Sequence, residues 1–181
     1  IDYNRLQQKK MGDTMGESGT MEVSMKKSII IIMVVSALAL AFTGCGEKDS
    51  SGEVTKIEEG KSLNIPIKDL SGKAKFYSIE VDGTEMEIFA TKDADGTIKT
   101  AFNTCQVCYD SGKGYYKQEG DKLVCQNCGN SFTLDQVGTI GSGCNPWPIL
   151  EENETITDDE IQIPYDFLKD ATSIFANWKE M

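Results

Sequence analysis

The chain has 181 residues, with 18 Lys and Arg against 29 Asp and Glu, and it contains no histidine. The absence of histidine excludes Ser-His-Asp triads, zinc sites with imidazole ligands and an ordinary Rieske centre, which needs two histidines. A formal net charge of −11 and a single arginine, Arg5, argue against a nucleic-acid partner, because nothing here would neutralise a phosphate backbone. The length permits one domain of ordinary size, and six cysteines in so short a chain call for a chemical explanation.

Residues 25–44 have the pattern of a secretory signal peptide. Two lysines precede a run of 14 mostly apolar residues from Ile29 to Phe42, and two small residues close the run. This run is shorter than the roughly 20 residues that a membrane-spanning helix needs. The cysteine that follows, Cys45, resembles the lipidated cysteine of a bacterial lipoprotein, with an uncleaved membrane anchor as the alternative. We therefore expect a lipid on Cys45 to hold the protein at the extracytoplasmic face of the cell membrane.

Three further segments are expected along the chain. Residues 1–24 precede the signal peptide and are interpreted as leader sequence outside the mature protein. Residues 45–60 are polar and charged and are expected to form a flexible tether. Residues 61–181 are expected to form a metal-binding β domain.

Alternating apolar and polar side chains predict a series of half-buried strands in this domain. The apolar positions of the first three runs are Leu63, Ile65 and Ile67; Tyr77, Ile79 and Val81; and Met86, Ile88 and Ala90. The pairs Asp82-Gly83 and Asp95-Gly96 predict tight turns between runs, because Gly and Asp tolerate positive φ. Residues 97–102 form the next predicted strand, which leads to Cys105.

The second half of the domain is less regular. A second hairpin is predicted around Gly120, and the proline-containing segment 145–148 is expected to be loop-like. A short closing strand is predicted at residues 161–163. The spacing of apolar side chains in residues 165–178 predicts a C-terminal helix of three to four turns.

Five cysteines in this domain form the strongest motif of the sequence. Cys105 and Cys108 form one Cys-x-x-Cys pair, 16 residues lead to a second pair, Cys125 and Cys128, and 15 more lead to Cys144. Each pair is typical of a tight turn that presents two thiolates to a metal. Four thiolates suit zinc, a single iron or an iron–sulfur cluster, and the spacing does not choose between them. We expect the two pairs to supply the four metal ligands and Cys144 to lie beside the metal.

Disulfides are the alternative to metal, since exported thiols tend to oxidise. An odd number of cysteines leaves one thiol over, and a disulfide within Cys-x-x-Cys closes too short a loop to stabilise the fold much.

The residues between the two pairs are enough for one hairpin to bring the pairs face to face. Gly112, Gly114 and Gly120 are interpreted as turn residues of that connection.

A resemblance to a known family rests on residues 102–149, which read FNTCQVCYDSGKGYYKQEGDKLVCQNCGNSFTLDQVGTIGSGCNPWPI. The motifs Cys-x-x-Cys-Tyr, Gly-Tyr, Cys-x-x-Cys-Gly-x-x-Phe and Gly-Cys-Asn-Pro-x-Pro resemble the C-terminal domain of the FtrD-like membrane iron–sulfur family. The resemblance implies an iron–sulfur cluster or iron as cofactor, with zinc as the alternative. It also implies a ferredoxin-like role beside the membrane components of a bacterial iron-uptake system.

A weaker similarity concerns architecture. The order of strands, ligand pairs and a proline loop is similar to that of a Rieske-type domain, with residues 143–146 on the loop that covers the cluster. This similarity implies a mainly β fold: an antiparallel Rieske-like β-sandwich with two Cys-x-x-Cys ligand loops and a short C-terminal helix. A zinc ribbon is the alternative fold.

No catalytic acid–base pair, nucleophile elbow or phosphate loop is visible, so we do not expect an enzyme. The leading expectation is a membrane-anchored electron carrier that assists iron uptake. A zinc-stabilised interaction module and a thiol–disulfide redox protein are the alternatives.

Overall fold

The computed structural model describes residues 54–138 and 143–179, so the expected leader, signal peptide and Cys45 lie outside the described residues. Eleven strands are described: β1 (Thr55–Lys56), β2 (Ser62–Pro66), β3 (Lys75–Val81), β4 (Thr84–Lys92), β5 (Ile98–Cys105), β6 (Tyr116–Glu119), β7 (Lys122–Cys125), β8 (Ser131–Thr133), β9 (Pro146–Ile149), β10 (Thr155–Ile156) and β11 (Glu160–Pro164). The helical segments are α2 (Tyr165–Asp170) and the 3-10 turns η2 (Ile67–Asp69), η3 (Tyr109–Ser111), η4 (Leu134–Gln136), η5 (Glu151–Asn153) and η6 (Thr172–Phe175). Within these described ranges, no helix is long and apolar enough to cross a membrane.

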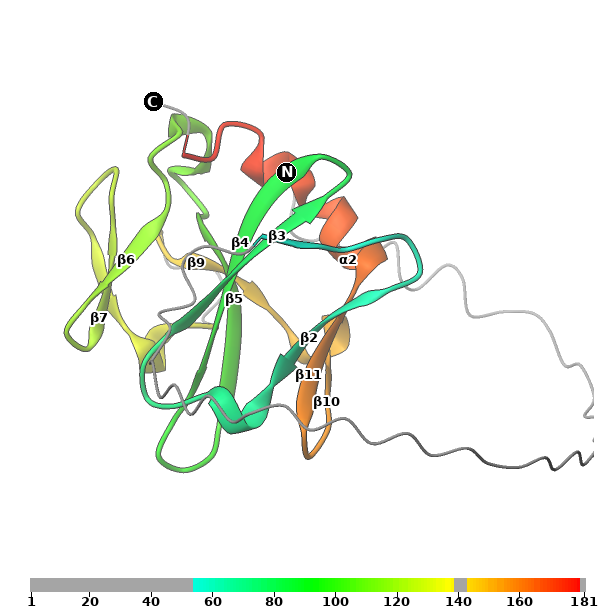
Figure 1. The fold of residues 1–181 in the computed structure, drawn as a ribbon. Coiled ribbons are helices and arrows are strands. Elements are labelled where there is room, and N and C mark those ends of the chain that lie inside the picture. Colours follow the sequence, from blue (N-terminus) through cyan, green and yellow to red (C-terminus); the bar gives the residue numbers. More distant parts are fainter. Residues whose placement is uncertain (1–53, 139–142, 180–181) are drawn as a thin grey trace, which may run out of the picture.

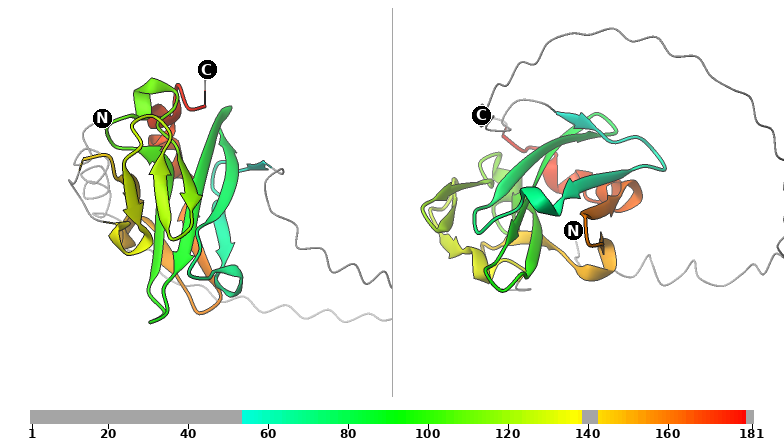
Figure 2. Two further views of the ribbon diagram at one scale, coloured as in Figure 1. Left: turned by 90° about the vertical axis from the view of Figure 1, so that its left-hand side faces the viewer. Right: turned by 60° about the horizontal axis from the view of Figure 1, so that its bottom comes forward.

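The strands form three sheets. The largest has the order β1-β3-β4-β5-β9, and two three-stranded sheets have the orders β10-β11-β2 and β6-β7-β8. The large sheet runs through the middle of the molecule (Figure 1). The β6–β7 hairpin lies on one side of it, and β2, β11 and α2 lie on the other, as the turned views also show (Figure 2).

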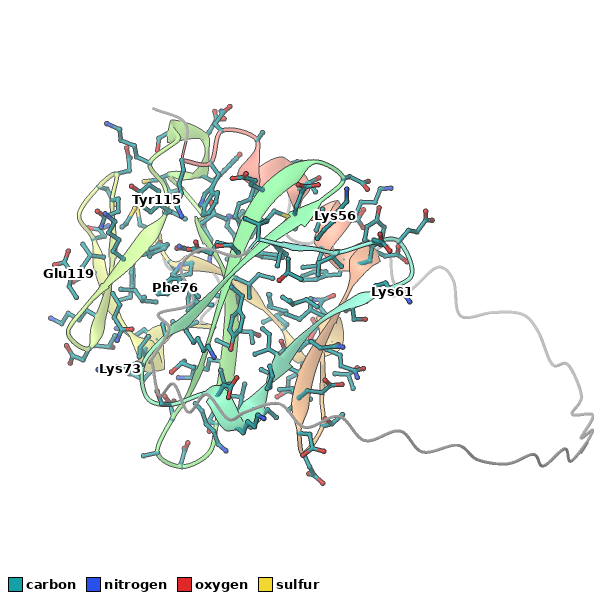
Figure 3. All side chains as sticks on the ribbon, viewed as in Figure 1. Lys56, Lys61, Lys73, Phe76, Tyr115 and Glu119 are labelled. Atoms are coloured by element: carbon teal, nitrogen blue, oxygen red, sulfur yellow. The ribbon has the colours of Figure 1, made fainter. Side chains whose placement is uncertain are left out.

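The central sheet is buried on both faces, which divides the apolar core into two clusters. Ile88 and Ala90 of β4 face the cluster that β2, β11, α2 and η6 complete. Phe89, between them in sequence, faces the second cluster, which includes residues of the β6–β7 hairpin. Phe76 also packs against the second cluster, and Figure 3 shows it on the side of the sheet toward that hairpin. This alternation follows from the two-residue period of a strand.

The prediction of a mainly β, antiparallel fold with a short C-terminal helix is confirmed. The pairing of β1 with β3 is parallel, and the other pairings are antiparallel. The predicted turns are present, because Asp82 and Gly83 have φ values of 50° and 79° and Gly96 has a φ of 92°. Two consecutive positive φ values match the twist that a two-residue hairpin turn requires.

The structure differs from the sequence expectations at three places. Residues 55–57 of the expected tether belong to the fold, since β1 pairs with β3 and Ile57 is buried in the core. The expected loop 145–148 instead contributes most of β9, which pairs with β5 at the edge of the sheet. Proline is tolerated there because an edge strand need not donate every backbone hydrogen bond.

The third difference is the C-terminal helix, which is shorter than expected. α2 ends at Asp170 and a 3-10 turn follows. The Thr172 hydroxyl donates to the Lys169 carbonyl at 2.8 Å, a local bond that competes with continued helix. The turn then buries Ile174 and Phe175 in the core.

Candidate metal centre

The two Cys-x-x-Cys pairs begin at the ends of strands from two different sheets. Cys105 is the last residue of β5, and Cys125 is the last residue of β7. Cys105, Cys108 and Cys125 are buried, whereas Cys128 is exposed. Each pair therefore starts with an inner cysteine that a strand holds and continues into a loop.

Hydrogen bonds donated by backbone N–H groups form each pair into a tight turn. The Cys108 N–H donates to Cys105 Sγ at 3.3 Å, a contact typical of metal-binding knuckles. In the second pair, the Gly129 N–H donates to the Cys125 carbonyl at 2.9 Å. Gly129 has a φ of 75°, which glycine adopts without the steric cost that a side chain brings.

Gly114 has a different role from the turn role that we expected. Its φ lies outside the left-handed region, but a Cβ on it would lie 2.3 Å from the Cys108 carbonyl oxygen. Its own carbonyl accepts a hydrogen bond from the Cys105 N–H at 2.6 Å. Glycine is therefore needed because the chain passes directly against the first Cys-x-x-Cys loop, a requirement that only the tertiary contact reveals.

All five thiols come together at one place. Cys105, Cys108 and Cys125 form one group in which every pair of sulfurs lies within 4.8 Å, and Cys108, Cys128 and Cys144 form a second. Cys108 belongs to both groups, and its sulfur lies 3.9 Å from that of Cys144. All five are free thiols in the structure. Which four of them bind a metal stays a prediction, since both groups contain three.

The loop that carries Cys144 is fastened to the first Cys-x-x-Cys pair. The Gln106 N–H donates to the Asn145 carbonyl at 3.0 Å, and the Gln106 side chain donates to the Pro146 carbonyl at the same distance. The Tyr116 hydroxyl donates to the Cys144 carbonyl. Sequence reasoning did not single out Gln106, and no local pattern reveals it, because its partners are about 40 residues away.

Burial raises the pKa of three of these thiols. It raises the pKa of Cys125 and of Cys144 to about 12 each, and it also raises the pKa of Cys108. Burial acts in the same direction on Cys128, but the Asn130 N–H and the neighbouring thiols outweigh it and lower the pKa of Cys128. Without metal, Cys108, Cys125 and Cys144 hold their protons, so a metal that binds them must displace these protons.

The donor set fits a thiophilic metal group. Thiolate sulfur selects zinc, iron–sulfur clusters and other soft ions over calcium or magnesium. An N–H donor to Cys105 Sγ supports negative charge on that sulfur. Five thiols therefore provide enough ligands for a four-cysteine site with one sulfur beside it.

Comparison with known proteins gives one family. No curated protein and no solved structure matches the chain, so the Rieske-like comparison stays a prediction. The family model described as "Membrane iron-sulfur containing protein FtrD-like" matches residues 69–175, which is more than half of the chain and includes all five clustered cysteines. The chain therefore belongs to the FtrD-like family of membrane iron–sulfur proteins.

Proposed function

We propose that this protein is a membrane-anchored, extracytoplasmic iron–sulfur protein that carries electrons in support of iron uptake. The observation that carries the proposal is the convergence of five thiols from three loops in a member of a membrane iron–sulfur family. The cluster would supply reversible one-electron chemistry, and the chain's residues would bind it and limit its contact with water. We do not propose an enzymatic role.

The grouping of the sulfurs supports a thiolate metal centre. One tetrahedral zinc with bonds of about 2.3 Å needs four sulfurs that all lie about 3.8 Å apart. Here the sulfurs form two groups of three around Cys108. Sulfurs this close to one another suit thiolates on a shared metal, and the choice of an iron–sulfur cluster over zinc rests on the family.

The burial of the sulfurs supports electron transfer. Cys105 and Cys125 are 0% and 1% exposed, whereas Cys128 is exposed and Cys144 partly exposed. Val107, within the first Cys-x-x-Cys pair, is 61% exposed and gives this edge an apolar surface. A centre with a protected interior and one edge near the surface allows a redox partner to approach without opening the fold.

Membrane attachment and location rest on the sequence and the family. The family is described as membrane-associated, and Cys45 follows a signal-peptide pattern, which together support a lipid anchor on the extracytoplasmic side. Stable anchoring of this kind requires more than one acyl chain. Membrane components of an iron-uptake system are the proposed partners.

The test is anaerobic purification of the full chain followed by iron, sulfide and zinc analysis and visible spectroscopy. We expect a coloured protein with iron and acid-labile sulfide, and Cys125→Ser should lose both. A colourless wild-type protein with one zinc per chain would support the zinc-stabilised interaction module and contradict the proposal.

A thiol–disulfide redox protein is the second candidate, because one observation favours it. Cys128 is exposed, its pKa is lowered, and it shares a Cys-x-x-Cys pair with Cys125. Exposed thiols of low pKa are the reactive ones. Reduction of a small disulfide substrate by the metal-free protein, with loss in Cys128→Ser, would support this candidate.

A further inference from the structure

The two inner cysteines have to be aligned across a gap between sheets. Cys105 ends a strand of the five-stranded sheet, and Cys125 ends a strand of the β6-β7-β8 sheet. Among the described strands, no strand ladder joins these two sheets. Contacts other than strand pairing must therefore set the position of one inner sulfur relative to the other.

The side chain of Asn103 makes one such contact. It is 1% exposed and lies two residues before Cys105 on β5. Its Oδ1 accepts from the Tyr116 N–H at 2.7 Å, and its Nδ2 donates to the Tyr116 carbonyl at 3.2 Å. Tyr116 is the register partner of Cys125 in the β6–β7 hairpin. The carboxamide thus pairs with the Tyr116 backbone as a peptide group of a neighbouring strand would. It connects the strand of Cys105 with the hairpin of Cys125.

Glu87 of β4 fixes which way this carboxamide faces. Asn103 Nδ2 donates to Glu87 Oε2 at 2.6 Å. Glu87 Oε1 accepts from Lys179 Nζ at 3.1 Å and from Ser78 Oγ at 3.4 Å. An ionised carboxylate only accepts hydrogen bonds, so it must face the NH₂ group of the amide, which leaves Oδ1 for the Tyr116 N–H.

We propose that Asn103 is a positioning residue for the metal centre, and that Glu87 holds the Asn103 carboxamide in the orientation that aligns Cys105 with Cys125. The inference rests on the proposed function in that the thiols bind metal, and it adds two residues outside the cysteine motif. Tyr116 extends the effect, because its hydroxyl donates to the Cys144 carbonyl. Moving Tyr116 would displace Cys125 through the hairpin and Cys144 through this bond.

The test uses Co²⁺ as the probe, since its thiolate charge-transfer bands report the number and geometry of bound sulfurs. The reduced full chain is titrated anaerobically, with folding followed by circular dichroism. Loss of a direct partner of a metal ligand typically lowers metal affinity 10–100-fold. Asn103 bonds Tyr116 and not a cysteine, so we expect Asn103→Ala to show a loss of about tenfold, at the low end of that range, together with weaker charge-transfer bands. Thr100→Val is the matched control: Thr100 is equally buried on β5, but its hydroxyl bonds to Glu154 and Ile149, away from the hairpin.

A pair of variants tests the orientation and remains informative if Asn103→Ala does not fold. Asn103→Asp replaces the Nδ2 donor by an oxygen that faces both Glu87 and the Tyr116 carbonyl, and it should bind Co²⁺ at least tenfold more weakly than wild type. The double variant Asn103→Asp/Glu87→Gln restores the contact between these two positions with donor and acceptor reversed, because the new amide at position 87 then donates to the new carboxylate at position 103. It does not restore the donor to the Tyr116 carbonyl. We therefore expect the double variant to bind Co²⁺ more tightly than Asn103→Asp but more weakly than wild type, a partial rescue that a general loss of stability would not predict.

Three results from the variants would overturn the inference. Wild-type affinity and spectrum in folded Asn103→Ala would show that Asn103 does not position the thiols. Equal weakening in Thr100→Val would assign the effect to general destabilisation of β5. A double variant no better than Asn103→Asp would remove the role of Glu87. Failure of the wild-type protein to bind Co²⁺ would instead contradict the proposed function, and the inference with it.

Discussion

Substitution of Gly114 gives a sharp test of how the first Cys-x-x-Cys pair is packed. In Gly114→Ala the new Cβ would lie 2.3 Å from the Cys108 carbonyl oxygen, 2.5 Å from its carbon and 2.8 Å from the Tyr109 nitrogen. All three atoms are backbone, so no side chain can rotate away. The chain would have to move by roughly 1 Å to reach ordinary contact distances.

The cost of this movement can be estimated from two contributions. Overpacking of a closely packed site costs about 1–3 kcal/mol. The same movement disturbs the hydrogen bond from the Cys105 N–H to the Gly114 carbonyl, which contributes about 1 kcal/mol. The expected loss in the free energy of unfolding is about 2–4 kcal/mol, or a melting temperature lower by on the order of 10 °C for a domain of this size.

Thermal unfolding of the reduced, metal-free full chain measures this loss. Gly72→Ala is the matched control, because Gly72 is exposed, its φ lies outside the left-handed region and nothing lies within 4 Å of a Cβ there. The control should melt at or slightly above the wild-type temperature. Equal melting temperatures for the two variants would refute the close approach at Gly114.

Three further predictions concern other parts of the chain. Cys144→Ser should keep the metal stoichiometry but change the redox potential or oxidative stability of the centre. If metal analysis shows that this variant loses metal as completely as Cys125→Ser does, Cys144 is a ligand. Cys45→Ser should release the protein from membranes or leave its precursor uncleaved, and unchanged processing and membrane partition on fractionation would favour an uncleaved anchor. Burial raises the pKa of Glu154 to about 7, against a hydrogen bond from Thr100 that lowers it, so the folded state binds this proton more tightly than the unfolded state. The stability that Glu154 contributes should be complete below pH 4.5 and fall by up to about 3 kcal/mol as the pH rises to 7. Denaturant unfolding between these pH values measures this fall, and Glu154→Gln should make the free energy of unfolding less dependent on pH. An unchanged pH dependence in the variant would contradict the assignment.

Much of the β structure was predictable because its signals are local. The alternation at Leu63 and Ile65 reflects the two faces of β2, and the Asp82-Gly83 turn needs two positive φ values. β9 was not predictable in this way. Prolines in residues 145–148 favour a loop on local grounds, and only the neighbouring β5 makes this segment an edge strand.

The metal centre likewise has features that local sequence patterns predict and features that depend on tertiary contacts. The two Cys-x-x-Cys pairs were predictable from local spacing, because the spacing within each pair forms one tight turn whatever surrounds it. The expectation that Cys144 lies beside the metal came without a local reason, and a tertiary contact brings its sulfur to Cys108. The close approach at Gly114 and the connection of the two sheets by Asn103 are visible only in the folded chain. These contacts join residues that are distant in sequence or belong to separate sheets, and their geometry exists only once burial of the two apolar clusters has brought the sheets together.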